Sequence, residues 1–158
     1  MANTQAMTTS FMGELLTATH NFGTAPIRAA TTADTFKAAL YLTTATINAS
    51  TTAYSATGEV SGTNYTAGGV TVTNATAPAS TNSSTTAGVA YWTPSASITY
   101  TTVTLSTAFD TVLIYNSTQS NKSVSVHTFG SQTITAGTFT LTMPSNTTST
   151  ALLRLATT

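Results

Sequence analysis

The sequence contains no cysteine and few charged residues. Only 5% of its 158 residues are charged, whereas an ordinary soluble protein has roughly 25%. Its basic residues are scattered and form no basic patch: Arg28, Lys37, Lys122 and Arg154. Nucleic acids and anionic membrane surfaces are bound through such patches, so neither is an expected partner. The absence of cysteine excludes a disulfide framework, a zinc–thiolate site and a thiol nucleophile.

Long apolar runs are also missing. No segment approaches the roughly 18 apolar residues that a membrane-spanning helix needs. The first residues, MANTQAMTTSFMGELL, lack the basic stretch and long apolar run of a signal peptide. We therefore expect neither a membrane span nor a secretory leader.

Threonine is the most informative residue type that is present. It makes up about a quarter of the chain, and hydrophobic residues make up 41%. Threonine favours β-strands, and the chain length suits one domain with a real core. A neutral surface of small polar residues favours association with copies of the chain or with neighbours.

The N-terminal segment has a different pattern from the rest. Within residues 5–18 the apolar residues recur at helical spacing, which predicts a short amphipathic helix. This stripe either covers one end of the chain's own core or docks on a partner. We favour a partner, because the segment differs in composition and is joined through a loop, and the predicted partner-binding residues are Phe11, Met12, Leu15 and Leu16.

From residue 34 onward the apolar pattern has a period of two, which is typical of strands. An inward face is predicted for the alternating residues Phe36, Ala38, Leu40 and Leu42. The apolar run 112–116 predicts a central strand, and residues 116–122, NSTQSNK, predict the turn of a hairpin. The alternation changes phase at 101–102 and again at 136–137, which predicts β-bulges there.

These patterns predict an all-β fold. We expect a single antiparallel β-sandwich or jelly-roll-like domain over residues 34–158, built from eight to ten short strands. Residues 1–33 form a helical or extended N-terminal segment with a short helix, and residues 75–87 form an exposed loop.

The glycine-rich stretch 57–69, TGEVSGTNYTAGG, invites comparison with phosphate-binding loops. It lacks the Gly-Lys-Ser/Thr ending of a Walker loop and the strand-to-helix setting of a dinucleotide fingerprint. Its glycines and Asn64 tolerate a positive φ and favour turns. We therefore interpret Glu59 as a solvated or hydrogen-bonded turn residue.

No motif for catalysis or metal binding is present, and no cofactor is expected. The acidic residues and the two histidines are separated in sequence and lack ligand spacing. An enzyme would become a serious alternative if Glu59, Asp110 and His127 shared one cleft. Trp92 is interpreted as a core or rim residue rather than a sugar-stacking platform.

Several segments together resemble a family of small structural proteins from the virions of tailed bacteriophages. They are SFMGELL, THNF, the run from ADTFKAALYL through TGEVSGTNYTAGGVTV, and later FDTVLIYNST and AGTFTLTMP. The resemblance covers most of the chain. It departs at Asn64, where the family usually has glycine, and across residues 75–87.

The resemblance implies a β-rich, non-enzymatic component of a virion. We expect a capsid decoration, or cement, protein that binds the outer capsid surface and bridges major capsid protein subunits. A homotrimer is expected, because local three-fold axes of a shell offer closed symmetric sites. The alternative is a head-fibre or tail-associated module that adheres to host glycans through an exposed aromatic residue: Tyr65, Tyr91 or Trp92.

Overall fold

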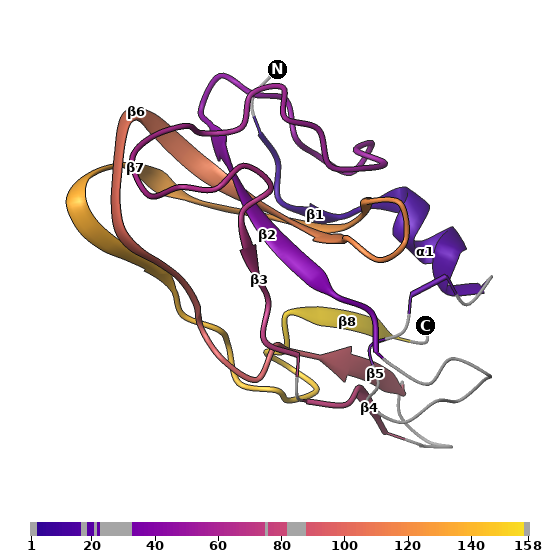
Figure 1. The fold of residues 1–158 in the computed structure, drawn as a ribbon. Coiled ribbons are helices and arrows are strands. Elements are labelled where there is room, and N and C mark those ends of the chain that lie inside the picture. The colour runs from indigo at the N-terminus through magenta and orange to yellow at the C-terminus, as the bar shows by residue number, and fades with distance from the viewer. Residues whose placement is uncertain are drawn as a thin grey trace.

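The computed structural model describes residues 3–16, 19–20, 22, 33–74, 76–81 and 88–156. These residues form an all-β fold in which antiparallel sheets pack against each other as a sandwich (Figure 1). The predicted fold class is confirmed.

The larger sheet has five strands in the order β1-β7-β6-β2-β3, and the smaller one has three in the order β4-β5-β8. The strands of the larger sheet are β1 (Ala6–Met7), β2 (Phe36–Leu42), β3 (Val70–Thr71), β6 (Ile98–Asn116) and β7 (Lys122–Leu141). The smaller sheet holds β4 (Ala79–Ser80), β5 (Val89–Trp92) and β8 (Leu153–Ala156), and one helix, α1, spans Thr9–Leu16.

Strands β6 and β7 form a hairpin that is far longer than the short strands expected from the sequence. The predicted turn is confirmed, with Asn116 paired to Lys122 at its base. Both predicted bulges are confirmed: the register shifts beside Thr102 and Ala136, whose φ angles are 52° and 46°. Where the sequence changes phase, the strand therefore bends and continues instead of ending.

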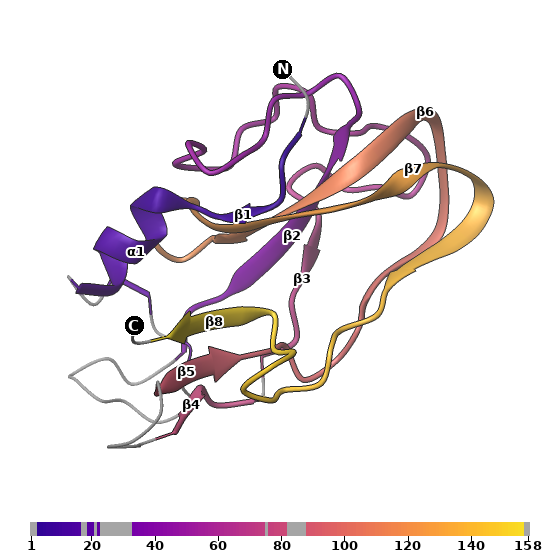
Figure 2. The ribbon, with the colours of Figure 1, turned by 180° about the vertical axis from the view of Figure 1, so that it is seen from behind.

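The bulges bend the outer half of this hairpin away from the central sheet. We call this outer half the arm, defined as Ile98–Ala108 of β6 and Phe129–Leu141 of β7. Figures 1 and 2 show the arm on the side of the molecule opposite α1, curving down to the smaller sheet.

Strand β2 is buried on both faces. The predicted inward residues Phe36, Ala38 and Leu40 are fully buried, but Ala39 and Tyr41 on the other face are equally buried. A second apolar cluster covers that face and includes residues from the loop after β2: Ala45, Ile47 and Tyr54. Loop residues with mixed polarity give no periodic signal, so the sequence pattern showed only one of the two faces.

The N-terminal segment is part of the same fold. Residues Ala6–Met7, inside the range predicted to be helical, instead pair with Ser125–Val126 at the edge of the larger sheet. Ahead of them, Thr4 N donates to the Ile47 carbonyl at 3.0 Å. The described residues of 1–33 therefore share a core and a sheet with residues 34–158.

Candidate interaction surface

The predicted partner-binding residue Phe11 lies in the chain's own core. Its side chain is 2% exposed, and its ring lies 4.9 Å from His20 and 5.9 Å from Phe22, centroid to centroid. Leu15 is partly buried and packs against the same core. The structure thus buries Phe11 without a partner, contrary to the interpretation that we favoured from the sequence. The side chains of Met12 and Leu16 lie outside the described residues.

A polar network ties α1 to the turn of the β6–β7 hairpin. The Glu14 carboxylate accepts from Lys122 Nζ at 2.6 Å and contacts His20 Nε2 at 2.7 Å. On the other side of the ring, Asn116 Nδ2 lies 3.1 Å from His20 Nδ1 and donates to Asp34 at 2.7 Å. Because Asn116 Nδ2 offers a donor, His20 Nδ1 accepts this hydrogen bond, which leaves His20 Nε2 to donate to Glu14.

This network sets the charge state of Glu14. Burial alone would raise the pKa of its carboxyl group, but the hydrogen bonds from Lys122 and His20 outweigh burial and hold it below the usual value. Glu14 is thus a charged residue that fixes α1 to Lys122 at the hairpin turn.

Glu59 is the centre of the glycine-rich stretch. Tyr54 and Tyr65 donate their hydroxyl protons to its carboxylate at 2.6 and 2.7 Å, and Gly68 N donates at 2.7 Å. Burial, with the nearby carboxylate, raises the pKa of Tyr41 to about 12 and the pKa of Tyr65 still further. The interpretation of Glu59 as a hydrogen-bonded turn residue is confirmed.

Substitution of Glu59 by glutamine is expected to destabilise the protein by about 2–4 kcal/mol, because an amide nitrogen cannot accept from these donors. Urea unfolding measures the change. In a double-mutant cycle with Tyr65→Phe the two losses should not add, since both remove the same hydrogen bond. Additive losses would contradict this arrangement.

The three residues named as a possible enzyme cluster have separate partners. Glu59 binds the tyrosines, Asp110 accepts from Asn3 at 2.8 Å and from Thr111 at 2.7 Å, and His127 contacts Ser125 at 2.9 Å. Strands β2 and β6 lie between Glu59 and the strand that carries His127. Three strand spacings amount to about 14 Å, so these two side chains share no cleft. Among the described residues no group of three or more His, Cys, Asp or Glu could hold a metal ion.

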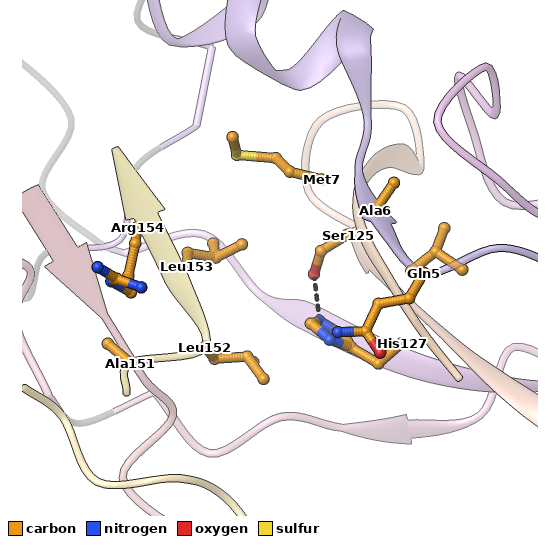
Figure 3. Close-up of a pocket in the computed structure, with 10 residues that line it drawn as sticks. Gln5, Ala6, Met7, Ser125, His127, Ala151, Leu152, Leu153 and Arg154 are labelled. Atoms are coloured by element: carbon orange, nitrogen blue, oxygen red, sulfur yellow. Dashed lines mark hydrogen bonds between the residues drawn. The ribbon is translucent and has the colours of Figure 1, made fainter. Parts of the chain in front are cut away.

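His127 lines a cavity of about 320 Å³ between the two sheets. Figure 3 shows that Gln5 and Leu152 lie near its ring, whereas the Arg154 side chain points away from it. The Arg154 side chain is held by a hydrogen bond from Nε to the Thr148 carbonyl at 2.6 Å. Burial lowers the pKa of His127 to about 4.

The stability of the protein is expected to fall between pH 6.5 and pH 4. In this range His127 takes up a proton in the unfolded protein but not in the folded one, and this uptake favours unfolding. The contribution of neutral His127 to the free energy of unfolding is therefore fully present above pH 6.5 and is lost as the pH falls toward 4. The loss is on the order of 3 kcal/mol. Urea unfolding across this range measures it, and His127→Gln should flatten the slope. An unchanged slope in that variant would contradict the assignment.

The aromatic residues considered for glycan binding differ in exposure. Trp92 is 3% exposed, and its indole N–H donates to Asn74 and to the Thr76 carbonyl, both at 3.0 Å. Its interpretation as a core residue is confirmed. Tyr65 stacks on Tyr100 and is held by Glu59. Tyr91 is half-buried on β5.

The arm carries no charged residue. The sequence has no Asp, Glu, Lys or Arg in residues 60–109 or 123–153, which include the whole arm. By contrast, Glu14, Asp34 and Lys122 gather beside α1, on the opposite side of the molecule (Figures 1 and 2). Apart from Ala136, the exposed side chains of the arm are hydroxyls and amides, for example Thr107, Gln132 and Thr133. The arm is the candidate interaction surface.

Comparison with family models, with curated proteins and with solved structures finds no match to this chain. In the described ranges no helix is long and apolar enough to cross a membrane.

Proposed function

We propose that the chain is a non-enzymatic structural protein of a phage virion, a capsid decoration protein on the outer capsid surface. It would bridge neighbouring subunits of the major capsid protein and stabilise the shell. The observation that carries this proposal is the uncharged arm. The resemblance of the sequence to small virion proteins supports it.

The physical reason lies in the cost of burying charge. A charged group at an interface must lose its hydration and needs a well-placed partner to recover that energy. Threonine and glutamine side chains can be buried with only local hydrogen-bond partners. An arm without charges is therefore suited to broad contact with a neighbour, and the centres of protein interfaces are depleted of charged residues for the same reason.

Reconstruction by electron microscopy is the direct test. Capsids assembled from the major capsid protein of the same phage are mixed with the purified chain and imaged. We expect density for the sandwich on the outer surface, with the arm against capsid subunits. A chain that leaves these capsids bare would contradict the proposal.

A charge-insertion pair sharpens the test. Thr107→Lys combined with Thr133→Lys places two cations on exposed positions of the arm. Capsid binding should weaken by at least roughly tenfold with an unchanged melting temperature. Thr44→Lys combined with Thr52→Lys adds the same charge at exposed positions in the loop after β2 and should bind normally.

A further inference from the structure

The last part of β7 is a regular strand whose outer edge pairs with no other strand among the described residues. After the bulge at Ala136, Phe139, Thr140 and Leu141 pair in order with Tyr100, Thr99 and Ile98 of β6. β1 pairs with β7 only at Ser125–Val126. In the described ranges no backbone hydrogen bond reaches the outer side of 137–141.

The side chains along this edge alternate. Thr138, Thr140 and Thr142 are exposed, and Phe139, Leu141 and Met143 are partly buried against the core. The stretch 138–143, TFTLTM, combines strong β propensity with no charge, no proline and no glycine. Such six-residue segments pair readily with other strands when their edge is open.

The usual protection against such pairing is missing within this stretch. Proteins normally guard an edge with a charged residue, a proline, a bulge or a covering segment. Here the bulge comes before the stretch, at Ala136, and the proline after it, at Pro144. The nearest charged residues in sequence are Lys122 and Arg154.

We propose that the edge 137–143 pairs with the same edge of a second copy, antiparallel about a two-fold axis. Length favours this partner, because the terminal strands of the two sheets, β1, β3, β4 and β8, have only two to four residues. The pairing is also self-complementary in side chains. It places threonines opposite threonines. A pair of this kind is already present between β6 and β7, where the Oγ1 atoms of Thr99 and Thr140 lie 3.4 Å apart.

The proposed assembly is a dimer, whereas shell symmetry alone led us to expect a trimer. When the same surface of two copies meets about a two-fold axis, the assembly is complete with two copies. It extends the larger sheet across the two copies. It concerns contacts between copies and holds whether or not the chain binds a capsid.

Cysteine substitution tests the pairing directly, since the chain has no cysteine of its own. Thr138→Cys, Thr140→Cys and Thr142→Cys scan the exposed side of the edge for the position at the axis. Under mild oxidation at least one of these variants should form a disulfide-linked dimer. Thr138→Cys mixed with Thr142→Cys should do so if these two positions face each other across the axis. Thr99→Cys is the matched control, because Thr99 is exposed on the same strand pair but one strand inside the edge. It should remain monomeric on a denaturing gel.

The mass of the purified protein provides an independent readout. Light scattering should give a dimer for the unmodified chain and a monomer for Thr140→Lys, which sets like charges across the axis, while Thr99→Lys stays dimeric. A monomeric or trimeric unmodified chain overturns the inference, as does equal cross-linking of the edge variants and Thr99→Cys. A dimer that leaves capsids bare overturns only the proposed function.

Discussion

Replacing Phe11 with alanine is expected to lower the free energy of unfolding by about 3–5 kcal/mol and the melting temperature by roughly 6–20 °C. Phe11 is 2% exposed and meets His20 and Phe22 at the end of the core. The substitution leaves a cavity that α1 cannot close without shifting, because Glu14 fixes the helix to Lys122. Calorimetry of the isolated protein measures the change.

A control substitution on the same segment shows whether the loss of stability comes from the core packing of Phe11. Thr4→Ala changes an exposed side chain on the same segment and should alter the melting temperature by no more than about 2 °C. Deletion of residues 1–20 should prevent cooperative folding, because it removes β1 as well as Phe11. A truncated protein that melts almost unchanged would restore the docking interpretation and contradict the packing seen here.

The sequence predicted the β elements well where the periodicity was clean. The inward face at Phe36, Ala38 and Leu40, the turn before Lys122 and the bulges near Thr102 and Ala136 all follow from alternation and its interruptions. These features depend on the two-residue period of a strand, which is local information. The burial of Tyr41 depends on the irregular loop after β2, which has no periodic pattern that the sequence could reveal.

The sequence predicted less about the burial of Phe11, the open edge of β7 and the arm. An apolar stripe around Phe11 shows that a face must be buried, but periodicity cannot tell the chain's own core from a partner's surface. The open edge at Thr138–Met143 gives no signal in the sequence, because the pairing partners of a strand follow from topology. The absence of charge over residues 60–109 and 123–153 was present in the sequence and could have marked the arm.

Gly69, in the glycine-rich stretch 57–69, is the other position where a substitution is expected to lower the stability strongly. Gly69 has a φ of 72°, and a methyl group on its Cα would overlap the Ala38 carbonyl. That carbonyl accepts a hydrogen bond from the buried Tyr100 hydroxyl at 2.9 Å. Since the obstacle is backbone in the middle of β2, it cannot move aside as a flexible side chain would.

Gly69→Ala is therefore expected to cost at least about 4 kcal/mol, enough to leave much of the protein unfolded or insoluble. Gly68→Ala should cost about 1–2 kcal/mol, because it shares the positive φ but has only the Tyr115 hydroxyl within 4 Å. Gly130→Ala is the control, since its added carbon meets nothing closer than the Gln132 amide at 4.0 Å. Urea unfolding of the three variants should rank them in this order. Equal losses for Gly69→Ala and Gly68→Ala would show that only the positive φ matters at these two positions. The close contact between Gly69 and β2 would then contribute nothing to the stability.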